Sequence, residues 1–502
     1  MKNRNLINIC ADSLIYLLED VLTKPYASMS SKESVIRTAA AERIPAYFHR
    51  LLCGTGTDGI LLNVNYDLSY IPVSGFDTAW QRADGTPISY DEPDCIDHWG
   101  RLYVEAHQCG VDPFRYAMDA IRKEGGEVWF SVRMNDYHYL RIPNAVCTFW
   151  TEHPEYRTSE YGVFDFSHKE VREYYKEYIC AFCREYAIDG LEWDMMRGST
   201  YFSGSITAEK EELLTEYLRT LYDAVRTIAH DKQHEMLIYA RVFSDIPANR
   251  NCGFAIPKWT QNGAAVVDGL ILSNFHNPTD FAIPFVDWRT WIDNPEIPLL
   301  AGCDFAAACI AYNNPVRRSV RMDVPAIKGF VAANHTLGAD GFYQFNIFMT
   351  TGGMAQICTP AEAEKGERRH ILTFRDPGES GICPIHLMPG ESRTFTMPLG
   401  RVPQKGSKSV LIGCTDNEPV AIAVNGVPVS GYQMKDTSAD YENAVVSYTV
   451  VERLEEVAPY FQRTQGQMQL KDGENQITIG NLSADPQTVL WVEVDIDAEC
   501  SD

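Results

Sequence analysis

A recurrent pattern marks the first part of the chain: an Asp-Gly pair is followed at once by a short apolar run. It occurs at 58–63, 189–194, 268–274 and 340–346, and each run turns polar only at its C-terminal end. Glycine permits a tight turn, and a run of this length and composition is typical of a buried strand. With similar runs elsewhere, we expect eight strands, at residues 5–10, 58–65, 127–134, 189–194, 236–242, 268–274, 298–304 and 340–346.

Segments with helical spacing separate these expected strands. Asp112-Pro113 is a typical helix start, because aspartate caps the first turn and proline fits its first position. Ser167 and Glu170 have the spacing of a capping box, which predicts a helix from there to about residue 187. The remaining expected helices span about 207–228 and 320–337.

The alternation of strands and helices predicts parallel βαβ units, and eight such units fit a (β/α)8 barrel. A doubly wound sheet is the main alternative. After about residue 380 the helical spacing disappears, and short alternating runs are separated by turns such as Asn425-Gly426, as in a β-sandwich. We therefore expect an α/β fold with two domains: a (β/α)8 TIM barrel with long top-face loops over 1–375, and an all-β sandwich accessory domain over 376–502.

The composition narrows the range of partners. The chain has 502 residues, and 44 Lys and Arg against 68 Asp and Glu give a formal net charge of −24. Such a surface repels phosphate and anionic lipid, so neither nucleic acid nor a membrane is an expected partner. Residues 1–24 lack the apolar core of a secretory signal, and the 14 cysteines lie mostly in apolar segments, as free thiols do in a reducing compartment. We expect a cytoplasmic protein; loss of a signal peptide stays open.

One segment, 189–197, has the strongest chemical signal. Glu192 and Asp194 are two residues apart in an expected strand, so they share a face, and carboxylates in an apolar strand are costly to bury without a purpose. Asp194 falls at the C-terminal end, where barrel enzymes place catalytic groups. Arg197 is expected to keep one of the two carboxylates ionised while the other stays protonated. The alternative is an internal ion-pair network that stabilises the barrel.

A second polar segment follows the third expected strand. Ser131, Arg133 and Asn135 share one face of it, and Asp136 and His138 follow on the loop. A polar row on the inner face of a buried strand indicates the lining of a site. The alternative is a cluster of hydrogen bonds that anchors the loop.

Asp304 ends the otherwise apolar seventh strand and is the expected partner of Asp194 across the barrel mouth, since glycoside hydrolysis needs two carboxyl groups. The alternative for Asp304 is a helix cap. In the eighth strand, alignment of its Asp-Gly pair with those of the other strands predicts that Tyr343 points inward, whereas the polar side chains predict that Gln344 and Asn346 do. The other residues expected to bind substrate are Asn63, Asn65, Trp99, Arg241, Asn274, His276 and Asn346.

The segments 189–197 and 133–138 resemble the glycoside-hydrolase families of bacterial polysaccharide degraders. That resemblance implies a (β/α)8 barrel with a trailing β-sandwich. It also implies a catalytic carboxylate at the end of strand four, which is Asp194 here. The partner carboxylate comes from strand six or seven in such families, and Asp304 matches that position.

The resulting functional prediction is a glycoside hydrolase that cleaves an O-glycosyl bond of an oligosaccharide or glycoside. Asp194 and Asp304 form the carboxylate pair, and Glu192 is an alternate or tunes the pair. Neither a metal nor another cofactor is expected, because the sequence lacks HxH and HExxH pairs, a Walker loop and a GxSxG elbow. A non-catalytic carbohydrate-binding barrel, a metal-dependent barrel hydrolase or lyase, and a homo-oligomer stay open.

Overall fold

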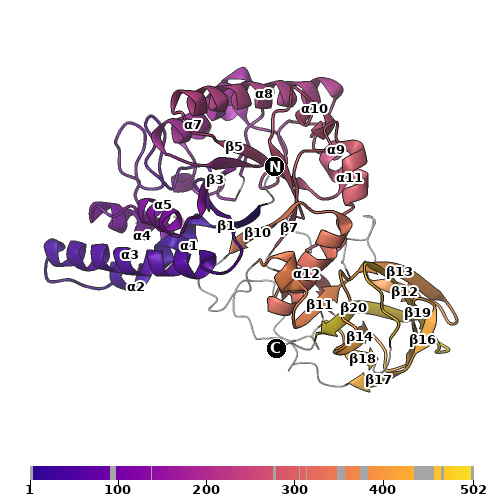
Figure 1. Ribbon diagram of the computed structural model, residues 1–502. Coiled ribbons are helices and arrows are strands. Elements are labelled where there is room, and N and C mark those ends of the chain that lie inside the picture. Colours follow the sequence, from indigo (N-terminus) through magenta and orange to yellow (C-terminus); the bar gives the residue numbers. More distant parts are fainter. Residues whose placement is uncertain are drawn as a thin grey trace. The chain divides into compact units, whose positions relative to one another are not determined.

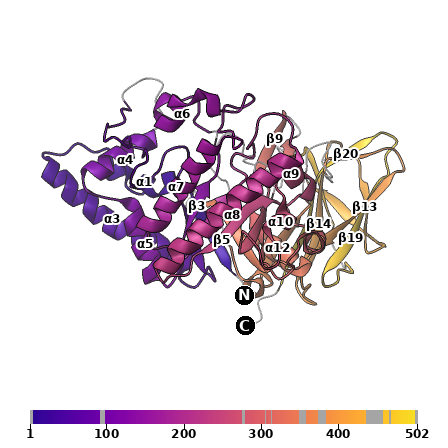
Figure 2. The ribbon, with the colours of Figure 1, turned by 90° about the horizontal axis from the view of Figure 1, so that it is seen from above.

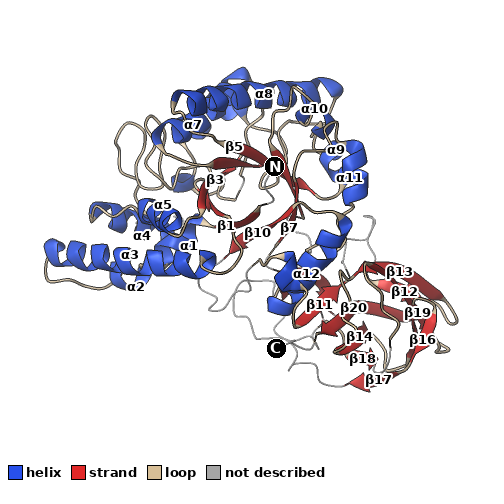
Figure 3. Cartoon of the chain, viewed as in Figure 1, coloured by secondary structure: helices blue, strands red, loops and turns tan. Residues whose placement is uncertain are grey.

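The structure is a computed structural model that describes residues 4–90, 98–136, 138–274, 279–304, 306–311, 314–347, 357–372, 383–434, 457–464 and 468–498. Eight parallel strands close into a barrel in the order β1-β10-β7-β6-β5-β4-β3-β2, which appears as a ring of strands in Figures 1 and 3. The predicted (β/α)8 barrel and all eight expected strands are confirmed. The barrel strands are β1 (Asn5–Ile9), β2 (Gly59–Asn63), β3 (Glu127–Arg133), β4 (Gly190–Asp194), β5 (Leu237–Phe243), β6 (Gly269–Ser273), β7 (Leu299–Cys303) and β10 (Gly341–Ile347).

Helix contacts show which faces of β3 and β10 point outward. The ring of Phe130 in β3 packs against Phe182 in α7 (Lys169–Glu185), with the ring centroids 6.2 Å apart. Side chains alternate along a strand, so Ser131 and Arg133 point into the barrel. In β10, Phe342 packs against Phe330 of α12 in the same way. Tyr343 therefore points inward, as the Asp-Gly alignment predicts, and Gln344 does not.

Two predicted helix starts differ from the structure. Helix α7 begins at Lys169, and the expected capping box is wrong because the Ser167 hydroxyl donates to the Asp165 side chain instead. The helix expected from residue 320 begins at Val324, because Asp323 caps its first turn and the two residues at 320 and 321 end a strand. The Asp112 cap is confirmed by a 3.0 Å bond from the Phe114 amide.

The helices between the strands cover the outside of the barrel, and α7 and α8 run side by side (Figure 2). The described α-helices are α1 (Ala11–Tyr16), α2 (Glu19–Leu22), α3 (Met29–Leu52), α4 (His98–Gln108), α5 (Pro113–Lys123), α6 (Thr148–Glu152), α7 (Lys169–Glu185), α8 (Ala208–Asp231), α9 (Ile246–Asn251), α10 (Ile256–Trp259), α11 (Phe285–Trp291), α12 (Val324–Leu337) and α13 (Pro360–Ala363), with 3-10 turns η1 (Pro143–Ala145) and η2 (Pro154–Tyr156).

Residues 54–59 have the GxGxxG spacing of a dinucleotide-binding loop. Such a loop follows a strand and opens a helix. Here the order is reversed, because the segment lies between the end of α3 and the start of β2. Gly54 and Gly56 adopt left-handed backbone angles, with φ of 73° and 71°, so the glycines serve a helix-to-strand turn.

The C-terminal strands form two antiparallel sheets whose apolar faces share one core, so the predicted β-sandwich is confirmed. Residues such as Val410 and Val494 from one sheet pack with Ile422 and Ile479 from the other. The domain boundary at 375 and 376 stays a prediction. One sheet contains β11 (Glu367–Ile371), β12 (Ile385–Leu387), β14 (Ser407–Cys414), β17 (Gly431–Met434), β18 (Tyr460–Thr464) and β20 (Gln487–Asp497); the other contains β13 (Ser392–Pro398), β15 (Val420–Val424), β16 (Val427–Val429) and β19 (Glu474–Asn481).

A separate hairpin, β8 (Ala306–Ala311) and β9 (Asn314–Arg321), follows β7 and was not expected from the sequence. None of the described helices combines the length and apolarity that crossing a membrane requires.

Candidate functional site

The two carboxylates of β4 lie inside the barrel. Strand register places Asp194 level with Arg133 of β3 and Arg241 of β5, and it places Glu192 level with Ser131. Residues at the same level of adjacent parallel strands share a face, so these side chains all point into the interior. Glu192 and Asp194 are both fully buried.

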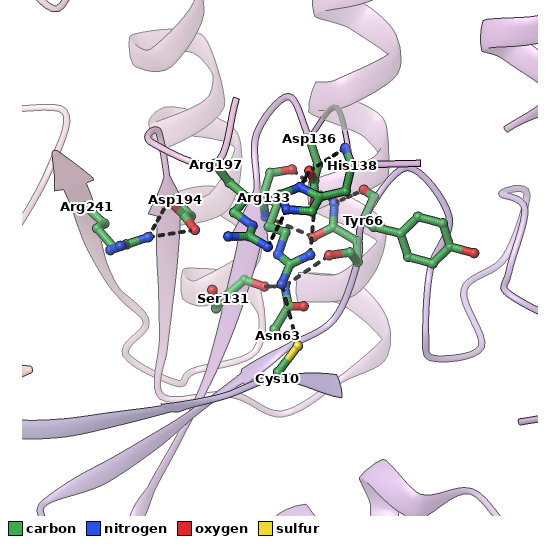
Figure 4. Close-up of polar contacts among 11 residues, drawn as sticks. Cys10, Asn63, Tyr66, Ser131, Arg133, Asp136, His138, Asp194, Arg197 and Arg241 are labelled. Atoms are coloured by element: carbon green, nitrogen blue, oxygen red, sulfur yellow. Dashed lines mark hydrogen bonds and ion pairs between the residues drawn. The ribbon is translucent and has the colours of Figure 1, made fainter. Parts of the chain in front are cut away.

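Asp194 forms a buried ion pair with Arg241 (Figure 4). The Arg241 Nη1 atom is 3.1 Å from each oxygen of the carboxylate, and the Met196 amide donates to Oδ1 at 3.1 Å. The exposed fractions of the two side chains are 0% for Arg241 and 1% for Asp194. The sequence predicted Arg197 as the residue that keeps one of the two carboxylates ionised. In the structure, Arg241 forms the ion pair with Asp194.

Arg197 instead belongs to a chain of polar groups at the end of β3 (Figure 4), formed by Arg133, Asp136, His138 and Arg197. Arg133 Nη1 donates to Asp136 Oδ2 at 2.8 Å, His138 Nδ1 is 2.5 Å from Asp136 Oδ1, and Arg197 Nη2 is 2.8 Å from His138 Nε2. A guanidinium group can only donate, so His138 Nε2 accepts and Nδ1 donates. The chain thus holds His138 in one tautomer, with 27% of its side chain exposed.

Asp136 is the anionic centre of this chain. Burial acts to raise the pKa of the Asp136 carboxyl, but the charge of Arg133 and the hydrogen bond from His138 outweigh it and hold that pKa well below its usual range. Asp136 therefore stays ionised at neutral pH, and it orients Arg133 and His138 rather than exchanging protons.

Three predicted asparagines bind main chain. Asn65 exchanges two bonds with the backbone of Arg133, at 2.9 and 3.0 Å. The Asn135 amide donates to the carbonyls of Phe164 and Thr200, at 2.9 and 2.8 Å. Asn63 donates to the Ser131 carbonyl at 3.3 Å. The loop-anchoring alternative given for the second polar segment therefore accounts for the contacts of Asn135, and Asn65 binds main chain in the same manner.

Trp99 lies in an aromatic cluster. Only 2% of its surface is exposed, and its ring packs on Tyr66 and Tyr70 at centroid distances of 5.4 and 5.3 Å. Because neighbouring aromatic rings cover the Trp99 ring, it cannot stack on a sugar without moving. We therefore assign Trp99 a packing role in this structure.

The remaining predicted residues lie at the ends of β6, β7 and β10. Asp304 follows β7 and is half-buried; its amide donates to the Thr279 hydroxyl at 3.2 Å. The helix-cap alternative for Asp304 is wrong, because strand β8 follows it. Asn274 follows β6 and is 9% exposed. His276 and the side chain of Asn346 in β10 lie outside the described residues.

The sequence analysis missed one interior residue of β1, Asn8, and the residue that follows β1, Cys10. Asn8 Nδ2 donates to Glu192 Oε2 at 3.1 Å, and Cys10 Sγ, just after β1, is 3.6 Å from Arg133 Nη2. Neither contact joins neighbouring strands, because β1 lies between β10 and β2, whereas Glu192 is in β4 and Arg133 is in β3. The available signal was Asn8 itself, a polar residue at an interior position of an apolar strand.

Two aspartates join the loops that follow β2 and β3. The Cys147 amide donates to Asp67 Oδ2 at 2.5 Å, and the Thr148 amide donates to Asp77 Oδ2 at 2.6 Å. Burial raises the pKa of Asp67 to about 7, against the opposing effect of the Cys147 amide. The connection between these loops therefore includes a carboxyl that titrates near neutral pH.

We predict that Asp67 makes stability depend on pH. The folded protein binds this proton more tightly than the unfolded chain, in which aspartate has a pKa of about 3.9. The stabilising contribution is complete below about pH 4 and is lost as the pH rises through about 7. Between about pH 5 and pH 8, the wild type should lose on the order of 2–3 kcal/mol of unfolding free energy relative to Asp67→Asn. Urea unfolding at both pH values measures this; parallel pH dependences would contradict it.

No family model matches this chain, and no curated protein matches it at a significant level. Solved structures with a similar course of the chain include the glycoside hydrolase domain of PgaB from Bordetella bronchiseptica (10% identity, 68% of this chain, 93% of that chain, TM-score 0.38). A second is a family GH18 chitinase from Chromobacterium violaceum (10% identity, 98% of this chain, 88% of that chain, TM-score 0.35). A third is a GH36 α-galactosidase from Geobacillus stearothermophilus (13% identity, 92% of this chain, 55% of that chain, TM-score 0.35). This chain thus spans about half the length of that α-galactosidase. Similarities of this size do not decide the function, which has to be argued from the residues.

Proposed function

We propose that this protein is a glycoside hydrolase in which Asp194 is the reacting carboxylate. The observation that carries the proposal is the position of Asp194: the C-terminal end of β4, on the inner face of a closed barrel, in an ion pair with Arg241. Barrel enzymes place reacting groups at this end of the strands. A carboxylate is costly to bury, and its retention at this point favours a chemical role.

The ion pair suits one of the two roles that glycoside hydrolysis requires. A carboxylate paired with arginine is a base or a nucleophile, because it carries no proton to give. Asp194 would attack the anomeric carbon or take the proton of an attacking water. The other role needs a second carboxyl group that would protonate the leaving glycosidic oxygen, and Asp304, the partner expected from the sequence, stays a prediction for it. The bond to that oxygen breaks as the new bond to the anomeric carbon forms, and the acid is left as a carboxylate. Where Asp194 is the nucleophile, that carboxylate then takes a proton from the water that displaces Asp194 and releases the sugar.

Substrate hydroxyls would bind to the chain of polar groups at the end of β3. His138 is partly exposed, and its Nε2 is contacted by Arg197. Both residues can exchange that contact for a hydrogen bond to a sugar hydroxyl. Glu192 lies one step deeper in the barrel, where Asn8 donates to it, so we assign it a positioning role beneath Asp194.

A second candidate function is carbohydrate binding without catalysis. The observation in its favour is that Arg241 contacts both oxygens of Asp194 and that only 1% of the Asp194 side chain is exposed. In this view the ion pair stabilises the barrel, and the rim residues bind a sugar that is never cleaved.

A substrate panel separates the two functions. We expect the purified wild type to release product from at least one member of a panel of nitrophenyl glycosides and oligosaccharides, with activity that survives chelation by EDTA. Calorimetric titration with the same oligosaccharides reports binding. Binding without product release would support the second function, and activity that disappears on chelation and returns with added metal would favour a metal-dependent hydrolase over both.

A further inference from the structure

The C-terminal ends of α3 and α5 come together on the side of the barrel where the strands begin. The two helices lie side by side (Figure 1), and each leads directly into a strand, α3 into β2 and α5 into β3. This face is opposite to the strand ends that carry Asp194. Whatever binds here is therefore separate from the proposed active centre.

Three side chains with different donor atoms meet at this point. His49 and Cys53 are one turn apart at the end of α3, and Glu124 is the C-cap of α5. His49 Nδ1 is 3.0 Å from Glu124 Oε2, and a ring nitrogen of His49, the sulfur of Cys53 and a carboxylate oxygen of Glu124 all lie within 4.8 Å of one another. Across the described parts of the chain, this is the one group of three or more His, Cys, Asp or Glu side chains with that proximity.

We propose that His49, Cys53 and Glu124 bind a divalent transition-metal ion of the zinc class, with solvent in the fourth position. Zinc binds nitrogen at about 2.0 Å and thiolate at about 2.3 Å, so tetrahedral ligands lie roughly 3.3–3.6 Å apart. His49 Nδ1 and Glu124 Oε2 are 3.0 Å apart, slightly closer than two ligands of one zinc ion. Cys53 is exposed, and 57% of the His49 side chain is exposed, so rotation about side-chain bonds can close the remaining distance.

The helix ends favour a cation at this position. The last turn of a helix presents carbonyl groups and carries partial negative charge. Two such ends meet here, one from α3 and one from α5. The thiol distinguishes the cluster from an ordinary surface pair: His153 and Glu155 show the same 3.0 Å contact, yet they form no group with a cysteine in the described residues.

Cobalt and zinc titration of tag-free, reduced full-length protein tests the proposal. We expect one equivalent of Co²⁺ to produce a thiolate-to-cobalt absorption band that added Zn²⁺ removes. Cys53→Ser and His49→Ala should each weaken Zn²⁺ binding by at least about 100-fold, since loss of even an outer partner of a metal ligand costs 10- to 100-fold. His153→Ala and Cys252→Ser are matched controls that should bind as the wild type does.

The outcomes separate a metal site from its alternatives. Stoichiometric binding that is lost in the two ligand variants and kept in both controls supports the proposal. Absence of the thiolate band, equal Zn²⁺ affinity in Cys53→Ser, or alkylation of Cys53 at the same rate with and without Zn²⁺ would overturn it. None of these results depends on glycosidase activity, so the metal site and the proposed function are tested independently.

Discussion

Asp194→Asn is expected to lower kcat on the best substrate of the panel by at least about 10³-fold. An amide can neither attack the anomeric carbon nor take a proton from water, and the loss of a positioned acid–base group costs 10² to 10⁴ in rate. The variant keeps the volume of the side chain and an oxygen that can still accept from Arg241. Substrate binding should therefore change far less than kcat, and initial rates across substrate concentrations separate the two.

Asp189→Asn is the matched control for this experiment. Asp189 immediately precedes the same strand, at the opposite end of the barrel from Asp194, and its carboxylate accepts from the Val128 amide at 2.7 Å. The substitution is chemically the same, and it perturbs the same strand without touching the proposed reacting group. We expect this variant to lose some stability and to keep wild-type kcat. Equal turnover by Asp194→Asn and wild type, assayed where both are folded, would remove Asp194 from the mechanism.

The strands could be predicted from sequence because each is marked by the pattern of its own residues. Parallel strands are buried on both faces, so they appear as continuous apolar runs, and an Asp-Gly pair marks the turn into several of them. The inward position of Tyr343 followed from the same local alignment. The start of α7 was misplaced because Ser167 bonds to Asp165, and a capping box is only one of several bonds that a serine can make.

The partners inside the barrel could not be predicted in this way. Arg197 is three residues from Asp194 in the sequence, yet the ion pair is formed by Arg241, which is 47 residues away and level with Asp194 on the neighbouring strand. Asn8 reaches Glu192 across the interior, over 184 residues of sequence. Which side chains lie at one level depends on how the strands are staggered when the barrel closes, and a single strand carries no record of that stagger.

The same register places the Asp194–Arg241 pair in the buried interior, where removing only one of the two partners is costly. We expect Arg241→Met to lower the free energy of unfolding by about 3–5 kcal/mol, because it leaves the Asp194 carboxylate charged in a site from which water is excluded. The double variant Asp194→Asn, Arg241→Met removes both charges and should recover much of that loss. Urea unfolding followed by tryptophan fluorescence reports on the barrel, since eight of the nine tryptophans precede residue 300.

Arg184→Met is the surface control for that cycle. Arg184 pairs with Glu177 at 3.1 Å, but the two side chains are 51% and 55% exposed, so its loss should cost at most about 1 kcal/mol. A cost for Arg241→Met as small as that of Arg184→Met would show that water reaches Asp194 in solution. A double variant no more stable than Arg241→Met alone would show that the methionine fails to pack, and that an uncompensated charge is not the source of the loss. Recovery in the double variant, together with a large cost for Arg241→Met, would establish that the reacting carboxylate we propose is held by one buried cation.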